Sequence, residues 1–439
     1  IYFVVRDDDG GSDLLFQTSD TTWQAYNRYG GNSLYEGAPV GRAYKVSYNR
    51  PLTIRDYAPE DNVFNAEYPM VRFLEANGYD VSYSTGVDTD RRGAELLEHK
   101  AFLSVGHDEY WSGQQRANVE AARDAGVNLA FFSGNEIFWK TRWENSIDGS
   151  GASHRTLVSY KETKANQVID PAAPTWTGTW RDPRFSPPGD GGRPENALTG
   201  QIFTVNCCDV DMVVNAADGD MRFWRNTRVA ALSGAQTTTV GTKIVGYEWD
   251  EDLDNGFRPA GTFRVSETQS SGEILQDFGS TYAQGSATHS MTMYRHSSGA
   301  LVFGAGTIQW SWGLDSSHDR GSAPADVAAQ QATVNLFADM GVQPATIMPG
   351  LSIATMSTDT TAPTSTITSP TASASLPVGN SVTITGTASD AGGGKVGGIE
   401  VSVDGGTTWR RATGRESWTY TFTPSTTGSL TIRSRAVDD

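Results

Sequence analysis

Two clusters of ionisable residues each follow an apolar run near the middle of the chain, and their residue types suit acid–base or metal chemistry. The run at residues 101–105 is followed by GHDEYW at residues 106–111, and the run at residues 128–132 is followed by SGNE at residues 133–136. Short apolar runs bounded by turn residues are typical of buried strands. In an open parallel sheet, ligands bind at the carboxyl ends of the strands. We therefore expect a catalytic site where these two strands end. Its candidate residues are His107, Glu109, Tyr110, Asn135 and Glu136.

The residue types in these clusters argue against two common chemistries. A serine hydrolase needs a nucleophile at the strand-to-helix turn, and residues 106–111 contain no serine or cysteine. A zinc site favours closely spaced His and Cys, but the six histidines are scattered and no HExxH motif occurs. Carboxylates and the Tyr110 phenol are hard oxygen donors, which suit ferric iron better than zinc. A metal-free acid–base pair and a polar binding pocket remain as alternatives.

Each of these residues also has a purely structural explanation. His107 could cap the following helix, and Tyr110 and Trp111 could pack against the sheet. Glu136 and Lys140 have the i,i+4 spacing of a surface ion pair on a helix. The concentration of ionisable groups at two strand ends nevertheless favours a functional site.

Two loops rich in aromatic residues are candidates for the walls of a pocket. Residues 18–35 hold several Tyr and Trp, which either pack against the domain or line the pocket, because loops after strands often carry function. Residues 142–203 are rich in Gly, Pro and Trp, and loops of this length are usually functional or held by aromatic packing. The substrate-binding candidates are Trp23, Tyr26, Asn27, Trp111 and His289.

Alternating strands and helices are expected to position these residues. The pattern predicts strands at residues 1–5, 14–17 and 79–85 and helices at residues 69–77 and 90–99. Ser112 is the expected N-cap of the helix between the two clusters. Strands that alternate with helices imply right-handed crossovers, and hence an α/β fold whose parallel sheet has helices on both faces. Later strands and one helix are expected at residues 211–215, 243–249, 260–265, 289–295, 300–304 and 325–340.

The chain is expected to contain two domains joined by a linker. Residues 1–350 form the α/β domain, and residues 351–370 are rich in Thr, Ser and Pro, as a linker is. Residues 371–439 contain short alternating strands separated by turn residues, which predicts an all-β Ig-like sandwich. This segment resembles the Ig-like modules of secreted bacterial enzymes and adhesins. We therefore expect an extracellular protein whose leader has been removed.

The charge balance argues against two classes of partner. The 439 residues include 34 basic and 51 acidic side chains, a net charge of −17. Such a surface repels nucleic acid and anionic membranes, and no apolar run approaches the roughly 20 residues that span a bilayer. We expect neither nucleic-acid binding nor membrane insertion.

Two local patterns have ordinary explanations. The adjacent Cys207 and Cys208 are expected to be two small strand residues, because a bond between neighbours needs an unusual ring. Asp250, Asp252 and Asp254 alternate as in a calcium loop, but the glycine falls one residue late and no glutamate follows at the right distance. A solvated acidic turn is therefore favoured over calcium.

The first cluster also carries a family resemblance. GHDEY at residues 106–110, followed by a helix, a strand and Gly134-Asn135, resembles the catalytic domain of the large (beta) subunit of N,N-dimethylformamidase. The resemblance covers about residues 1–341. It continues through TWQAYN at residues 22–27, GYEWD at residues 246–250, His289-Ser290 and the strand at residues 301–310.

The resemblance implies a class I glutamine-amidotransferase-like fold and hydrolysis of a small amide at a mononuclear iron held by two tyrosines and a glutamate. Tyr110 matches one tyrosine ligand. The second is expected near the start of the helix at residues 69–77, where Tyr68 lies, in a register that otherwise places Pro69 at the ligand position. Glu136 is the candidate glutamate, although it follows Asn135, where the formamidase pattern has glycine.

The first functional hypothesis is therefore a secreted hydrolase of an amide or related C–N bond, with iron as the candidate cofactor. Tyr110 would be a metal ligand or proton donor, and Glu136 or Glu109 would orient or deprotonate water. His107 would orient these groups.

Two rival hypotheses assign no catalysis. In the first, an extracellular protein binds a polymer such as a glycan through Trp23, Tyr26, Trp176 and Trp180. In the second, the protein is a structural part of a homo-oligomer or extracellular assembly that forms through the Ig-like domain.

Overall fold

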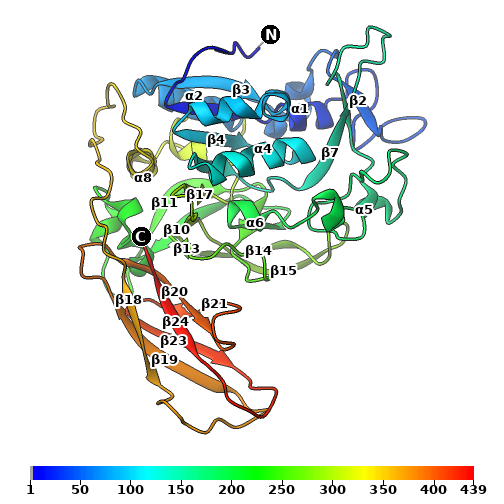
Figure 1. Ribbon diagram of the computed structural model, residues 1–439. Coiled ribbons are helices and arrows are strands. Elements are labelled where there is room, and N and C mark those ends of the chain that lie inside the picture. The colour runs from blue at the N-terminus through cyan, green and yellow to red at the C-terminus, as the bar shows by residue number, and fades with distance from the viewer. Residues whose placement is uncertain (1–2) are drawn as a thin grey trace.

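The computed structural model describes residues 3–439, and a seven-stranded sheet forms the centre of the first domain (Figure 1). The strand order is β13-β16-β17-β6-β4-β1-β3. Five neighbouring strands are parallel, as expected, while β16 and β13 add an antiparallel edge. The strands are β1 (Leu14–Thr18), β3 (Val81–Thr85), β4 (Ala101–Gly106), β6 (Asn128–Ser133), β13 (Phe263–Arg264), β16 (Thr292–Arg295) and β17 (Leu301–Gly304).

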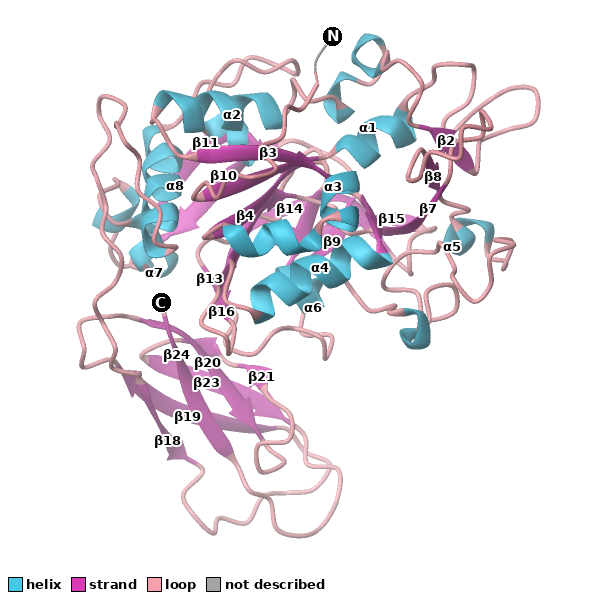
Figure 2. Ribbon diagram, turned by 45° about the horizontal axis from the view of Figure 1, so that its top comes forward, coloured by secondary structure: helices cyan, strands magenta, loops and turns pink. Residues whose placement is uncertain are grey.

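Helices cover both faces of this sheet, as the alternating pattern predicted (Figure 2). On one face, α2 (Glu67–Ala76) and α8 (Val327–Asp339) contribute to the core that contains Phe16. On the other face, α4 (Gly113–Asp124) contributes to the core that contains Leu15. Because successive side chains of a strand point to opposite faces, neighbouring residues of β1 enter different cores.

Local capping sets the start of two helices beside the sheet. Ser112 caps α4 in a capping box with Gln115, which confirms the expected N-cap. Thr85 forms the same box with Asp88 at the start of α3 (Gly86–Arg91). A 3-10 helix follows at Gly93–Glu98, so the helix expected at residues 90–99 is two short segments.

Smaller antiparallel sheets, which sequence analysis predicted poorly, make the first domain richer in strands than expected. The long β14–β15 hairpin was missed because TQSSGEIL has little apolar alternation. A closed barrel contains β9 (Ile202–Val205), β12 (Trp249–Glu251), β14 (Thr268–Leu275) and β15 (Tyr282–His289). A second sheet contains β2 (Lys45–Ser47), β5 (Tyr110–Ser112), β7 (Trp139–Glu144) and β8 (Thr156–Val158), and a ribbon pairs β10 (Val210–Asn215) with β11 (Thr237–Val245).

Three local predictions were wrong. Phe3–Val5 forms no strand, and residues 1–2 lie outside the described part; Phe3 and Val5 are exposed and pair with no sheet edge among residues 3–439. The expected loop at residues 18–35 contains α1 (Asp20–Tyr26), on which Trp23 is buried, while Tyr29 and Tyr35 lie in the loop that follows the helix. Cys207 and Cys208 form a disulfide instead of two independent strand residues.

The three remaining short helices are α5 (Glu162–Ala165), α6 (Asn196–Thr199) and α7 (Ala216–Gly219).

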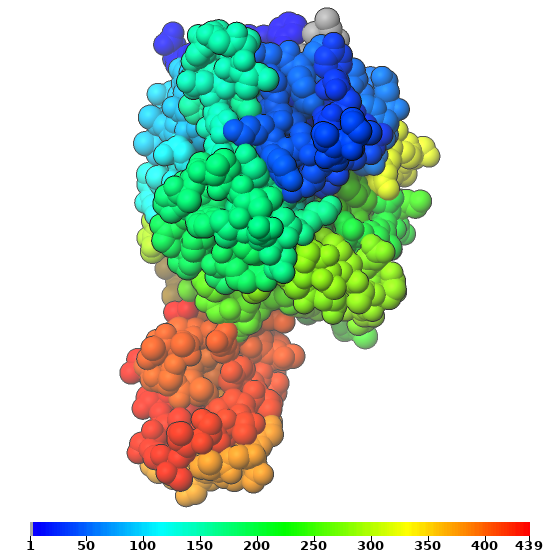
Figure 3. Space-filling view, turned by 90° about the vertical axis from the view of Figure 1, so that its right-hand side faces the viewer, coloured from blue at the N-terminus to red at the C-terminus, as the bar shows by residue number. Residues whose placement is uncertain are grey.

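The C-terminal segment is an Ig-like sandwich of two sheets, as predicted, and it forms a narrower lobe beside the first domain (Figure 3). Trp418 lies in its core between the sheets. The sandwich begins with β18, inside the segment expected to be a linker. Its strands are β18 (Thr364–Ser369), β19 (Val382–Ser389), β20 (Val396–Ser402), β21 (Arg410–Arg411), β22 (Thr413–Gly414), β23 (Ser417–Phe422) and β24 (Arg433–Asp438).

A buried ionic contact joins the Ig-like domain to the segment that follows β12. The Glu400 carboxylate accepts the Gly261 backbone N–H at 3.1 Å and lies 3.6 Å from the Arg258 guanidinium. Arg258 in turn pairs with Asp252 at 2.6 Å, immediately after β12. The Ig-like domain therefore contacts the chain segment that leaves the barrel.

Among residues 3–439, no helix is both long enough and apolar enough to cross a membrane.

We predict that the two domains unfold as one unit because of this ionic contact. Removing the Glu400 carboxylate leaves the Gly261 N–H without its acceptor, while Arg258 keeps Asp252 as its partner, so we expect a cost of about 1–3 kcal/mol. Calorimetry of Glu400→Ala should show a lower Tm and a separated Ig-like transition. Glu36→Ala, which removes an exposed partner of Arg28, should change the Tm little. A single unshifted transition in Glu400→Ala would contradict the prediction.

Candidate functional site

The turn after β4 sends the GHDEY segment into the interior. Gly106 has φ +88°, which favours glycine, and a Cβ atom there would lie 2.9 Å from the Glu67 Cδ. The chain can therefore turn closely against α2 only at a glycine. The turn buries the side chains of His107, Glu109 and Tyr110.

His107 is the centre of a buried network of carboxylates. Its Nδ1 lies 2.9 Å from Asp61 Oδ1, and its Nε2 lies 3.1 Å from Glu248 Oε2 and 3.6 Å from Glu109 Oε2. The Tyr247 hydroxyl contacts the same Nδ1 at 2.8 Å and donates to Asp61. Burial by itself would lower the pKa of His107, but its hydrogen bonds to Asp61 and Glu248 raise that pKa well above the ordinary imidazole value. The ring is therefore an imidazolium that holds these acids together.

Two phenols converge on the carboxylate of Glu109. The Tyr35 hydroxyl donates to both oxygens at 2.8 and 3.0 Å, and the Tyr26 hydroxyl donates to Oε2 at 3.3 Å. The two rings stack with centroids 4.1 Å apart. The Tyr110 hydroxyl donates to the Tyr35 hydroxyl at 2.6 Å rather than to Glu109. Burial raises the pKa of Glu109 to about 7, although His107 and Lys161 oppose the shift.

Lys161 brings an amine without a hydrogen-bond partner in the described chain to the same group. Its side chain is fully buried, and its Nζ makes no hydrogen bond within residues 3–439. The Nζ lies 3.1 Å from the centroid of the Tyr35 ring, 4.8 Å from that of Trp139 and 5.1 Å from that of Tyr110. Burial lowers the pKa of Lys161 well below its usual value, although the charge of Glu109 raises it. A buried amine without a hydrogen-bond partner is costly, so a ligand or a function is needed to explain it.

The second strand end joins the group through Asn135. The Asn135 side-chain amide donates to Glu248 Oε2 at 2.7 Å, and its backbone N–H donates to Asp250 at 2.9 Å. Its side-chain oxygen has no hydrogen-bond partner in the described part of the chain. The expectation that the ends of β4 and β6 meet therefore has a structural counterpart in His107, Asn135 and Glu248.

Glu136 has a different environment from Tyr110. Its carboxylate is buried, and both oxygens lack a hydrogen-bond partner among residues 3–439. Burial raises its pKa well above normal, and the charges of Asp250, Asp108 and Glu195 add to the shift. Lys140 lies on β7 and pairs with Asp190, so the expected i,i+4 ion pair on a helix is absent from this segment.

The other predicted site residues have contacts of their own. Tyr68 lies against Phe64, outside the Tyr110 group. The Trp23 indole donates to Glu67, and Asn27 holds the following loop through the Pro51 carbonyl. Trp111 belongs to the core around α4, and His289 contacts the Ala305 carbonyl in the barrel. The three acidic loop residues also separate: Asp250 accepts from Asn135, Asp252 pairs with Arg258 and Arg264, and Asp254 pairs with Arg410.

The tyrosine–glutamate group in the structure is therefore Tyr26, Tyr35 and Glu109, and not Tyr110, Tyr68 and Glu136. Sequence analysis noted Tyr26 and Glu109 in other roles and Tyr35 only as one aromatic of its loop. It missed Asp61 and Lys161, which lie in segments without a recognisable motif. Tyr247 and Glu248 belong to the GYEWD segment, which could have indicated them.

Comparison with known protein families agrees with the resemblance seen in the sequence. Residues 1–325 match the family described as N,N-dimethylformamidase beta subunit-like, C-terminal, and residues 363–433 match the bacterial Ig domain. No curated protein matches the chain. Because the first match covers 325 of the 439 residues, the chain belongs to the N,N-dimethylformamidase beta subunit-like family.

We predict that unfolding stability falls as the pH rises from about 4 to about 7. Burial raises the pKa of Asp108 to about 7, while an unfolded aspartate titrates near about 4. The folded state therefore binds this proton more tightly than the unfolded state does. The free energy of unfolding falls between the two pKa values, and the loss is complete once Asp108 has ionised in the folded state. Asp108→Asn should raise the Tm relative to the wild type more at pH 8 than at pH 5. The control is Asp124→Asn, because Asp124 is exposed. An equal Tm difference between Asp108→Asn and the wild type at both pH values would contradict the assignment.

Proposed function

We propose that this protein hydrolyses the C–N bond of a small amide, with a mononuclear iron held by Tyr26, Tyr35 and Glu109. Family membership supports an amidohydrolase-type reaction. The observation that carries the proposal is the convergence of two phenols on one buried carboxylate. The class I amidotransferase-like fold belongs to the proposal as well, and the parallel strands with helices on both faces support it.

The donor set fits a hard cation. All three groups offer oxygen, which trivalent iron prefers over softer ligands. Burial and the neighbouring Glu109 charge raise the pKa of Tyr26 and Tyr35 well above normal, so both phenols stay protonated in the absence of a cation. A bound cation would favour their ionised forms. The unpartnered side-chain oxygen of Asn135 offers an acceptor for the attacking water.

When bound, iron would act as a Lewis acid on the amide carbonyl. Glu248 could receive a proton from the attacking water on Oε1, because His107 and Asn135 both contact Oε2 and so fix the carboxylate in place. The same carboxylate can return that proton to the leaving nitrogen. His107, fixed between Asp61 and Glu248, holds the carboxylate in orientation.

Lys161 and the aromatic rings around it would exclude water from one side of the site. The Lys161 amine has no hydrogen-bond partner in the described chain, so its N–H groups can donate to oxygen that becomes negative in the reaction. Because the surrounding rings are apolar, such an interaction is stronger there than in water.

Burial of the aromatic side chains argues against the glycan-binding alternative. Trp23 and Trp180 are buried, and Trp180 packs beneath Arg116 and Lys140. A glycan platform needs exposed rings, and the other two candidates, Tyr26 and Trp176, are half-buried. Export from the cell remains part of the proposal, since the Cys207–Cys208 disulfide is typical of an oxidising compartment.

Two phenols of the same cluster provide a matched test of the iron site. We expect the purified wild type to contain iron and to show a tyrosinate-to-iron absorption band. Tyr35→Phe should lose iron and hydrolysis of N,N-dimethylformamide. Tyr110→Phe removes only a donor to Tyr35, so it should keep iron and lose about 10-fold to 100-fold in activity. Loss of iron in Tyr110→Phe together with retention in Tyr35→Phe would contradict the assignment.

Lys161 provides a second test, in which stability and activity should change in opposite directions. Lys161→Met removes a buried amine that has no hydrogen-bond partner in the described chain but keeps an apolar stem, so the Tm should rise by about 1 °C per kcal/mol gained. Amide hydrolysis should fall in the same variant. A lower Tm would indicate that Lys161 stabilises the fold, and unchanged activity would remove it from the mechanism.

A further inference from the structure

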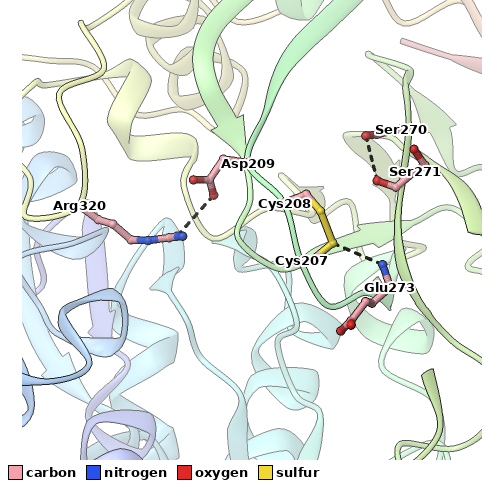
Figure 4. Close-up of a disulfide and its surroundings, with 7 residues drawn as sticks. All are labelled: Cys207, Cys208, Asp209, Ser270, Ser271, Glu273 and Arg320. Carbon is pink, nitrogen blue, oxygen red and sulfur yellow. Dashed lines mark hydrogen bonds and ion pairs between the residues drawn. A yellow bond between two sulfur atoms is a disulfide. The ribbon is translucent and has the colours of Figure 1, made fainter. Parts of the chain in front are cut away.

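The bond between neighbouring Cys207 and Cys208 forms a small covalent ring in the connection from β9 to β10 (Figure 4). Cys208 is exposed to solvent, whereas Cys207 is partly buried. The Cys207 sulfur accepts the Glu273 backbone N–H at 3.3 Å. One sulfur is therefore anchored to β14 while the other is open to a reagent.

The ring holds Cys208 in an unfavourable backbone conformation. Its φ is +74°, in the left-handed region that residues with a Cβ rarely adopt. Opening the ring would remove this constraint and let residue 208 relax to a negative φ. The next residue, Asp209, would then move with it.

Asp209 connects this turn to the segment that carries Tyr247. Its carboxylate accepts from Gln309 Nε2 at 3.3 Å. The same carboxylate accepts from Arg320 Nη1 at 3.4 Å (Figure 4). It also lies so close to Gly246 that a Cβ there would be 2.6 Å from Asp209 Oδ1. A displacement of Asp209 would therefore change the contacts of Gly246, the residue before Tyr247.

Arg320 completes the connection to the candidate site. Its guanidinium carbon lies 5.0 Å from the centroid of the Tyr247 ring. The Tyr247 hydroxyl contacts His107 Nδ1 at 2.8 Å and donates to Asp61. A continuous series of contacts thus runs from the disulfide through Asp209 and Arg320 to the imidazolium.

We propose that Cys207–Cys208 is a reversible redox switch that controls the position of Tyr247 and, through it, the His107 network. The effect on catalysis rests on the proposed amide hydrolysis, whereas the effect on Tyr247 does not. Closed, the ring holds Asp209 against Gly246 and Arg320. When the disulfide is reduced, Asp209 is free to leave Gly246 and Arg320, and the activity of the site falls.

A dithiol is the chemical class of reductant that opens the ring. Its thiolate attacks the exposed Cys208 sulfur, the bond between the two cysteines breaks, and Cys207 leaves as a thiolate that takes up a proton. The second thiolate of the reagent then attacks the reagent sulfur that is bonded to Cys208. Cys208 leaves as a thiolate, which is protonated in turn. Two electrons pass to the cysteine pair, and the reagent is oxidised to a cyclic disulfide.

Hydrogen exchange of the full-length protein, before and after dithiothreitol, tests the proposal. Thiol labelling verifies the reduction. Peptides that cover residues 244–250 should exchange about tenfold faster after reduction, which corresponds to a loss of about 1.4 kcal/mol of local stability. Hydrolysis of N,N-dimethylformamide should fall several-fold, and oxidised glutathione should restore both properties. Unchanged exchange after complete reduction, or resistance of the folded protein to reduction, would overturn the proposal.

Two variants make the result specific. Cys207→Ser/Cys208→Ser should show the fast exchange at residues 244–250 with and without dithiothreitol. Arg320→Met removes one of the two connections from Asp209 to Tyr247, the other being Gly246, so the response of exchange at Tyr247 to the reagent should become smaller. A full response in Arg320→Met would overturn the proposed route. If no state hydrolyses the amide, the proposed function fails, and hydrogen exchange alone decides the switch.

Discussion

The burial of several acids around one histidine is the constraint on which the site depends. Asp61, Glu109 and Glu248 share the His107 imidazolium, and a protonated Lys161 would also stabilise the Glu109 carboxylate. Removing carboxylates from water is costly unless they are paired. Protonation offsets part of that cost, because burial raises the pKa of Glu109 to about 7. A cation held by Glu109 and two phenols would offset it without neutralising the carboxylate.

The fold brings these groups together from segments that are distant in sequence. The parallel strands β4 and β6 end side by side, which places His107 and Asn135 at one sheet edge. The chain around α1 supplies Tyr26 and Tyr35 above that edge. Glu248 is the residue before β12. The segment that follows β12 contacts the Ig-like domain through Arg258. The C-terminal domain is thus in contact with a segment that leads to the site, and not only an appended module.

Sequence reasoning predicted the regular part of this architecture better than the site itself. The strands and helices from β3 to β6 follow clear apolar periods, and Ser112 carries a recognisable capping pattern. The β14–β15 hairpin lacks such a period, and α1 was missed because its aromatic residues suggested a loop. In the site, Tyr110 has the more recognisable motif, yet its hydroxyl meets Tyr35 rather than Glu109. Such a choice between adjacent side chains depends on three-dimensional packing, which spacing along the chain does not specify.

Anomalous diffraction from crystals of the protein at the iron absorption edge tests the central claim most directly. The account predicts one anomalous peak within bonding distance of the Tyr26 and Tyr35 hydroxyl oxygens and the Glu109 carboxylate. A peak instead beside Tyr110, Tyr68 or Glu136 would contradict it. The claim would also be contradicted if crystals grown with excess iron showed the two phenols still donating hydrogen bonds to Glu109.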